Sequence, residues 1–369
     1  MEQIVLNHPV LIPPKPVLRG EDGNGVFTFI YRGPQLDEIQ ALWDRKNCCI
    51  KILKNIEKSN PFTEDVKKKW WGFSTLSKGS LLTEAVAIQN LYAIHNVAPR
   101  VYAVFVIVVN GEKHWAMLVE DMGHIEKVDG DTENACNALI NGPLKELAKI
   151  YGIKVFDDGV EYNIMQGKYV DFQGFHFTED HKERIKKRLI GVANVGKWGP
   201  WMNYQDILEL EIRGGRNMEH RIKALHLDEV DFRGKTVLDV GCSEGAFCRY
   251  AIDRGAKRVM GIDLKGVTKP AAALSYYLGY NNIDYKGYDL RYDVPTDLGP
   301  FDITLFLSMG LHIGYPTWLN LMTRELLVFE GNGRDVDASC IQMMKDSFKT
   351  VEEKGFSEDL NRRPVVWAR

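Results

Sequence analysis

Apolar and polar residues follow two different patterns along the chain. In the first half, short runs of β-branched and aromatic residues are separated by turn residues, which is typical of strands. Apolar residues at helical spacing occur between these runs and again toward residue 190. The expected strands are 25–33, 47–53, 100–111 and 113–123, the expected helices are 81–95, 134–153 and 181–190, and a tight hairpin is expected over 162–174.

The pattern changes after residues 191–200, a segment that contains several glycines and ends in proline. Helices and strands then alternate, which predicts a doubly wound α/β domain with a mostly parallel sheet. We therefore expect two domains, 1–192 and 193–369. The expected strands of the second domain are 236–241, 258–263, 283–290, 301–308 and 327–331, and its expected helices are 203–215, 218–225, 246–255, 269–280 and 317–326.

Residues 236–266 carry the first candidate site. Gly241 directly follows an apolar strand, where a residue without a side chain permits a sharp turn and close approach of the backbone to a ligand. Gly245 lets the next helix begin close to the same ligand, and a helix N-terminus favours an anionic group such as a carboxylate. Asp263 closes the following strand and can accept hydrogen bonds from the hydroxyl groups of a ribose. The spacing therefore predicts a nucleoside-containing ligand.

The segment VLDVGCSEGAF at 237–247 resembles motif I of class I S-adenosylmethionine-dependent methyltransferases, which have a Rossmann-like fold. Segments 285–290, 301–314 and 355–369 resemble the third-strand, fourth-strand and closing-hairpin segments of the same family. The resemblance implies that S-adenosylmethionine is the cofactor, that Asp263 holds its ribose and that Asp289 contacts its adenine amine. The implied cofactor-binding residues are Asp239, Gly241, Cys242, Ser243, Gly245, Asp263, Leu264, Asp289, Leu290 and Ser308.

His312, just after the fourth expected strand, is a candidate general base for methyl transfer to a hydroxyl group. Packing or helix capping explains this histidine equally well, and an acceptor oxygen that is already an anion needs no base. Cys242 and Cys248 are interpreted as small packing residues. The short segment LSMGLHI at 307–313 resembles a branch of the superfamily that modifies the wobble uridine of tRNA, so RNA stays open as an acceptor.

A second set of candidate site residues lies upstream. In chain order these residues are Lys51, Glu84, Asp158, Asn163 and Asp171. This order resembles the protein-kinase-like fold, an α+β fold with a strand lysine, a helix glutamate, a D-x-x-x-x-N loop and a D-F pair. The resemblance implies that Lys51 holds phosphates of ATP and pairs with Glu84. Asn163 and Asp171 would then ligate Mg²⁺, and Asp158 would be the catalytic base.

The upstream set departs from the kinase pattern in several places. Phe156 stands where such loops usually have histidine, and DFQG at 171–174 replaces D-F-G. The spacing of 33 residues between Lys51 and Glu84 implies an insertion, and the segment after Asp171 is too short for a full helical lobe. Two functions therefore stay open for the first domain: an active phosphotransferase, or a degenerate domain that only binds a substrate or partner.

Composition adds little to this picture. The 369 residues include 47 Lys and Arg against 50 Asp and Glu, and the net charge of −3 gives no argument for nucleic acid or an anionic membrane surface. The chain has no CxxC pair and no signal-peptide pattern at its start. The most apolar run, 101–109, is far shorter than the ~20 residues of a membrane helix. We expect a cytoplasmic protein without a membrane span.

The combined expectation is a bifunctional enzyme. Its first domain would use ATP and Mg²⁺ to phosphorylate a hydroxyl group of a glycan, lipid or small molecule, and its second would methylate the hydroxyl or phosphate with S-adenosylmethionine. The alternative is a methyltransferase, with tRNA among its conceivable substrates, whose first domain only binds the substrate or a partner.

Overall fold

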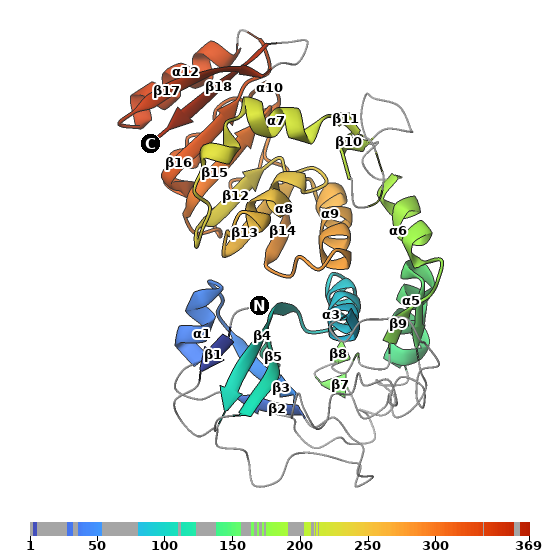
Figure 1. Ribbon diagram of the computed structural model, residues 1–369. Helices are drawn as coiled ribbons and strands as arrows, with labels where there is room; N and C mark the ends of the chain where they lie inside the picture. Colours follow the sequence, from blue (N-terminus) through green and yellow to red (C-terminus); the bar gives the residue numbers. More distant parts are fainter. Residues whose placement is uncertain are drawn as a thin grey trace, which may run out of the picture. The chain divides into compact units, whose positions relative to one another are not determined.

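The chain divides into two compact units, Met1–His181 and Lys182–Arg369, in a computed structural model (Figure 1). The expected domain boundary, between residues 192 and 193, lies outside the described residues. None of the helices in the described part of the chain is long and apolar enough to cross a bilayer. The structure describes residues 3–5, 28–31, 36–53, 80–109, 112–122, 138–155, 164–165, 168–169, 172, 175–190, 203–207, 210, 212, 214–334, 336–357 and 362–369.

The first unit contains a five-stranded sheet with the order β1-β4-β5-β3-β2. Only the β1–β4 pair is parallel, and the other neighbours are antiparallel. The strands expected at 25–33, 47–53, 100–111 and 113–123 are confirmed, whereas β1 was not expected. The strands are β1 (Gln3–Val5), β2 (Thr28–Tyr31), β3 (Cys48–Leu53), β4 (Val101–Val109) and β5 (Glu112–Glu120).

Helix α3 (Ser80–Ala93) joins β3 to β4 and has the apolar spacing that predicted it. Its residues Ile88 and Leu91 are fully buried. The buried side chain of Asn90 pairs with the backbone of Val101 through two hydrogen bonds of 2.8 Å, which fixes the helix to the start of β4. The other helices described in the first unit are α1 (Leu36–Leu42), the π-helix η2 (Ile140–Leu144) and α5 (Lys145–Tyr151). Helix α6 (His181–Ile190) begins at the last residue of this unit and otherwise belongs to the second.

Two small antiparallel pairs complete the described part of the first unit. Strand β6 (Ile153–Val155) pairs with β9 (Phe175–Phe177), and β7 (Ile164–Met165) pairs with β8 (Lys168–Tyr169). The second pair confirms the hairpin expected over 162–174. In the sequence, the hairpin of β7 and β8 therefore lies between the paired strands β6 and β9.

The second unit contains a seven-stranded sheet with the order β14-β13-β12-β15-β16-β18-β17. Strands β12 to β16 are parallel, and β18 and β17 close the sheet as an antiparallel pair. The strand order reverses between β12 and β15, which is where open α/β sheets bind ligands at the carboxyl ends of their strands. The strands are β12 (Thr236–Val240), β13 (Arg258–Asp263), β14 (Ile283–Gly287), β15 (Phe301–Leu307), β16 (Thr323–Glu330), β17 (Val351–Ser357) and β18 (Arg363–Ala368).

Apolar clusters cover both faces of this sheet. Every residue of β12 is buried, with Val237 in one cluster and Leu238 in the other. Residues of α8 belong to the first cluster, and residues of α11 and α12 belong to the second. Alternate residues of a strand point to opposite faces, so this arrangement explains the continuous apolar runs in the sequence. The helices are α7 (Met218–Ala224), η5 (Leu227–Glu229), α8 (Ala246–Asp253), α9 (Lys265–Tyr277), α10 (Gly310–Ile313), α11 (Trp318–Met322) and α12 (Val336–Ser347).

Two expected helices are wrong in whole or in part. Over 203–215 the structure has β10 (Asn203–Gln205) and β11 (Gly214–Arg216), which pair in parallel. A side chain at Gly214 would overlap the backbone of Gln205, so the close backbone contact requires glycine. Over 317–326 the helix α11 ends at Met322 and β16 begins at Thr323, because these residues pair with β15.

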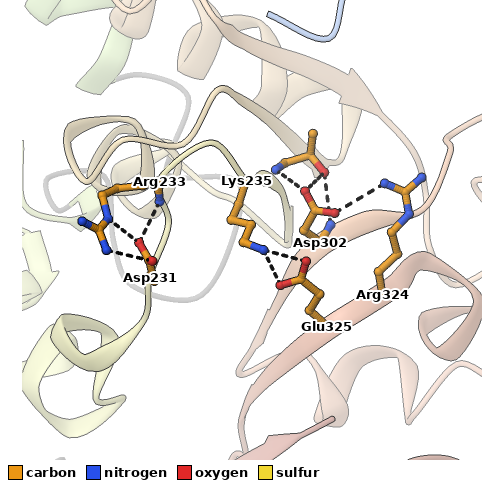
Figure 2. Close-up of polar contacts among 7 residues, drawn as sticks. Asp231, Arg233, Lys235, Asp302, Arg324 and Glu325 are labelled. Carbon is orange, nitrogen blue, oxygen red and sulfur yellow. Dashed lines mark hydrogen bonds and ion pairs between the residues drawn. The ribbon is translucent and has the colours of Figure 1, made fainter. Parts of the chain in front are cut away.

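Polar contacts hold the amino ends of the central strands (Figure 2). Asp302 Oδ2 accepts hydrogen bonds from the backbone nitrogen and Oγ1 of Thr236, at 2.8 and 2.9 Å. Burial alone would raise the pKa of Asp302, but these bonds and the nearby Arg324 guanidinium outweigh it and lower the pKa. Lys235 forms a 2.6 Å ion pair with Glu325 at the same edge. The candidate site lies at the opposite edge of the sheet, at the carboxyl ends of the strands.

Candidate cofactor site

The loop after β12 brings a helix N-terminus to the carboxyl edge of the sheet. Gly241, Ser243 and Gly245 all have left-handed backbone conformations, with φ of 77°, 50° and 75°. The backbone nitrogen of Gly241 donates to the carbonyl oxygen of Ile262 at 2.8 Å, which joins the loop to the end of β13. Helix α8 begins directly after Gly245. These conformations fold the loop tightly between two strand ends.

Asp263 faces this loop from the end of β13. Its Oδ2 accepts a 2.9 Å hydrogen bond from the backbone nitrogen of Ser243, and its Oδ1 accepts a 2.7 Å bond from that of Leu264. Burial raises the pKa of Asp263, against the opposing effects of these two hydrogen bonds. A carboxylate offers about four acceptor positions, so two ribose hydroxyl groups can be accommodated beside the two backbone donors. The residue therefore fits the role expected for it.

The two loop glycines contact protein side chains. A Cβ atom at Gly241 would overlap the side chain of Met309, and one at Gly245 would overlap the hydroxyl group of Tyr285. The sequence suggested instead that these glycines leave space for a ligand. In the structure, the first neighbours of both positions are side chains that pack on the loop from β14 and from the turn after β15.

Three titratable side chains near the loop are buried: the carboxyl group of Asp239 and the thiols of Cys242 and Cys248. Asp239 is 2% exposed, and Cys248 Sγ donates to its Oδ2 at 3.2 Å. Burial raises the pKa of Asp239 to about 7. Burial also raises the pKa of Cys248 to about 11 and raises the pKa of Cys242, so both thiols stay protonated at neutral pH. Buried, protonated thiols agree with a packing role for these cysteines.

Residues of β10 also contact the loop. The backbone nitrogen of Tyr204 donates to Glu244 Oε1 at 2.8 Å, and Gln205 Oε1 accepts from the backbone nitrogen of Ala246 at 3.1 Å. Gln205 thus satisfies the first backbone donor of α8. Sequence reasoning missed these contacts because it placed a helix over 203–215. The consecutive glycines Gly214 and Gly215 were the available signal against that helix.

A buried ionic cluster lies at the ends of β15 and β16, on the other side of the switch point, where the strand order reverses between β12 and β15. Glu330, fully buried at the end of β16, lies 2.5 Å from Arg221 and 3.4 Å from Arg216. Its carboxylate also accepts from Ser308 Oγ, which in turn accepts a 2.5 Å bond from Arg363. Burial would raise the pKa of Glu330, but Arg221, Ser308 and Arg216 lower it. An acid that interrupts the apolar run of β16 was the sequence signal for this cluster.

The remaining expected residues of the second unit lie at neighbouring strand ends. His312 is an exposed residue of α10. Asp289, after β14, forms an ion pair with Arg291 at 2.6 Å. Leu264 is 45% exposed, and Leu290 is partly buried. The structure therefore brings the whole expected cofactor set to the carboxyl edge of one sheet.

The upstream set is described only in part. Lys51 lies in β3 between Ile30 and Met117 of the neighbouring strands, and Glu84 lies in α3. The expected catalytic and metal-binding residues Asp158, Asn163 and Asp171 lie outside the described residues. In the part of the chain that is described, no group of three or more His, Cys, Asp or Glu residues could hold a metal ion.

The family match with known proteins lies within the second unit of the chain. Residues 217–297 match the FtsJ-like methyltransferase family. The chain is 30% identical over 152 residues to a ubiquinone biosynthesis O-methyltransferase of Nitrosococcus oceani, a match that covers 40% of this chain and 55% of that protein. It is 30% identical over 134 residues to a tRNA U34 carboxymethyltransferase of Marinobacter nauticus, covering 36% and 39%. The chain thus spans about half, or less, of the length of these relatives.

Solved structures show weaker likeness. The bifunctional kinase-methyltransferase WbdD has 16% identity and a TM-score of 0.38, covering 50% of this chain and 45% of that one. A ribosomal protein L11 methylase of Lactobacillus delbrueckii has 19% identity and a TM-score of 0.35, covering 46% and 90%. Such low scores carry no functional argument. The strand order and the sequence matches define the class: the second unit has a Rossmann-like methyltransferase fold and is similar to S-adenosylmethionine-dependent methyltransferases.

Proposed function

We propose that the second unit binds S-adenosylmethionine and transfers its methyl group. The observation that carries this proposal is the Asp263 carboxylate, held 2.9 Å from the backbone nitrogen of Ser243 between the ends of β12 and β13. This arrangement places a hydroxyl-binding carboxylate beside a helix N-terminus that favours an anion. Ribose and amino-acid carboxylate are the two polar ends that such a site recognises in this cofactor.

The other residues divide the remaining roles. Asp289 would accept from the adenine amine, and Leu264 and Leu290 would contact the adenine ring. When bound, the cofactor supplies an electrophilic methyl group on a sulfonium. The protein holds the acceptor in line with it. His312 would remove the proton of a hydroxyl acceptor, whereas a phosphate acceptor needs no base.

Calorimetry with S-adenosylmethionine and S-adenosylhomocysteine tests this proposal. Both ligands should bind the wild-type chain, and Asp263→Ala should bind them more weakly. Asp231→Ala is a matched control, because Asp231 pairs with Arg233 (Figure 2) just before the amino end of β12, whereas the site lies at the carboxyl ends of the strands. A wild-type chain that binds neither ligand would rule out the proposal.

We further propose that the first unit is kinase-like and phosphorylates a hydroxyl group, and that the second unit then methylates the phosphorylated product. The sheet order β4-β5-β3-β2, with α3 between β3 and β4 in the chain, supports this proposal because it puts Lys51 on an inner strand that the helix of Glu84 follows in the sequence. The buried Phe172, next to Asp171, also packs against Tyr92 of α3 at a ring distance of 5.2 Å. In kinases the phenylalanine of the D-F pair likewise sets the state of the site through packing.

Mg²⁺-dependent consumption of ATP, with Asp171→Ala as the inactive variant, tests the phosphotransferase. The acceptors to screen are glycans, lipids and nucleosides. A chain that binds S-adenosylmethionine but not Mg·ATP supports the alternative, a methyltransferase whose first unit only binds a substrate or partner. For tRNA, which the Marinobacter nauticus relative acts on by name, affinity should fall steeply with salt. Affinity that is indifferent to salt counts against an RNA acceptor.

A further inference from the structure

The turn from β15 into α10 is strained and tightly held. Ser308, its first residue, has a left-handed φ of 62°, a conformation that residues with a side chain rarely adopt. Its backbone nitrogen donates to the carbonyl oxygen of Glu330 at 2.7 Å, and its hydroxyl group contacts the Glu330 carboxylate. Strained residues persist where their surroundings determine the conformation, often at functional sites.

One side chain spans this turn. Asn332 Nδ2 donates to the carbonyl oxygen of Ser308 at 2.9 Å, and Asn332 Oδ1 accepts from the backbone nitrogen of Leu311 at 2.9 Å. Asn332 is 7% exposed, so water does not easily replace these bonds. Its amide therefore links the end of β15 directly to the first turn of α10.

Asn332 is itself fixed by Asp337 at the start of α12. Both carboxylate oxygens of Asp337 accept from the backbone nitrogen of Asn332 at 2.9 Å, and Oδ2 also accepts from those of Gly333 and Arg334, at 2.7 and 3.1 Å. The buried carboxylate thus determines the position of the loop that carries the amide. The turn after β15 is consequently attached to α12 as well as to its own strand.

Asn332 bridges the carbonyl group of Ser308 and the backbone nitrogen of Leu311, and a residue that contacts the cofactor loop lies between these two groups in the chain. Met309 lies between them, and its side chain covers Gly241. His312 follows Leu311 directly and donates its backbone N–H to the carbonyl oxygen of Met309 at 2.8 Å. A shift of this turn would therefore move Met309, whose side chain lies against the cofactor loop, together with His312 in the same turn.

We propose that Asn332 is a positioning residue for methyl transfer, which acts by holding the turn of Met309 and His312 against the cofactor loop. The inference rests on the proposed methyltransferase function. Asn332 would contribute little to cofactor affinity, because the ribose is held from β13, on the other side of the switch point. It would instead affect the alignment of the acceptor with the methyl group.

Asn332→Ala and Asn332→Asp test this role in the full chain. Hydrogen exchange should become faster at the amides of α10 in Asn332→Ala, while the amides of β12 and β13 keep their protection. Asn332→Asp keeps an acceptor for Leu311 but places a carboxylate oxygen against the carbonyl oxygen of Ser308, so exchange at α10 should be at least as fast as in Asn332→Ala. The matched control is Asn320→Ala, because Asn320 contacts Tyr315 at 2.6 Å outside this turn.

Methyl-transfer kinetics should separate positioning from binding. Misalignment of about 1 Å can reduce a rate ~100-fold, so kcat of Asn332→Ala should fall by roughly that factor, while KM for S-adenosylmethionine changes by less than about threefold. The loss should not add to that of His312→Ala in the double variant. Additive losses, or an unchanged kcat, would overturn the inference. Absence of cofactor binding in the wild type would instead refute the proposed function, and the exchange data would still report on the turn.

Discussion

Arg221 and Glu330 form a buried ion pair between residues 109 positions apart in the sequence, with Nη2 of Arg221 2.5 Å from Oε2 of Glu330. The pair joins α7, which precedes the sheet, to the carboxyl end of β16. It also lies beside Ser308, the strained residue at the start of the α10 turn. Packing of the helix before the sheet and the geometry of the candidate site are therefore physically connected.

Glu330→Gln should destabilise the second unit by about 3–5 kcal/mol, because it leaves the Arg221 guanidinium buried without its charge partner. The protection of β15 and β16 in hydrogen exchange measures this loss. Glu219→Gln is the control, because Glu219 is 79% exposed and pairs only with Lys223 on the surface of α7. It should change stability by less than about 0.5 kcal/mol.

The same pair predicts a pH dependence. Because the pKa of Glu330 is lower in the folded protein than in the unfolded chain, the unfolded chain binds more protons at acidic pH. The stability from this group is present above the ordinary glutamate pKa of about 4.3 and is lost as the pH falls through the lower, folded-state value. Denaturation measured from neutral to acidic pH should show a shallower loss in Glu330→Gln. An identical slope in both proteins would contradict the assignment.

Asp263→Ala should weaken S-adenosylmethionine binding by about 1.5–3 kcal/mol, or roughly 10–150-fold, because hydrogen bonds to a charged group are lost. Burial raises the pKa of Asp263, so affinity in the wild type should begin to fall at a higher pH than an exposed aspartate would give. Calorimetry over a pH series measures both effects. Unchanged affinity in Asp263→Ala would remove this residue from the site.

The sequence predicted the central strands, and it predicted that the expected site residues would lie at the carboxyl edge of the sheet, for physical reasons. An apolar run that is buried on both faces must be an inner strand of a parallel sheet, and β12 has this pattern without interruption. The acid at the end of β13 could be placed because consecutive parallel strands end at the same edge. These predictions needed only residues close together in the chain.

Features that depend on distant partners could not be predicted in this way. The apolar spacing of 203–215 resembles a helix, but Tyr204 and Gln205 bond to the loop some 40 residues later, and this tertiary contact overrides the local pattern. The role of Asn332 likewise depends on a turn 21 and 24 residues earlier. A single acid or amide after an apolar run indicates that this side chain has a hydrogen-bond partner, but the local sequence does not identify that partner.

The amino edge of the sheet offers a contrast between buried and exposed polar contacts (Figure 2). Thr236→Val removes the 2.9 Å bond from Oγ1 to the mostly buried Asp302, and should cost about 1 kcal/mol or more. Glu325→Gln disrupts a surface pair with Lys235, and should cost about 0–1 kcal/mol. Neither change should alter cofactor affinity, since both lie at the edge opposite the site. Calorimetry and hydrogen exchange on the two variants test this separation, and a loss of affinity in either would contradict it.

The contact between Gly241 and Met309 separates two reasons for a glycine in the cofactor loop. Gly241→Ala places a side chain at φ 77°, at a cost of about 1–2 kcal/mol, and it also overlaps Met309, for which overpacking costs about 1–3 kcal/mol. Introducing the same change into Met309→Ala removes the overlap but keeps the backbone cost. Gly241→Ala should therefore destabilise the second unit less in that background, and the difference gives the packing contribution. Equal costs in both backgrounds would show that the backbone conformation alone requires the glycine.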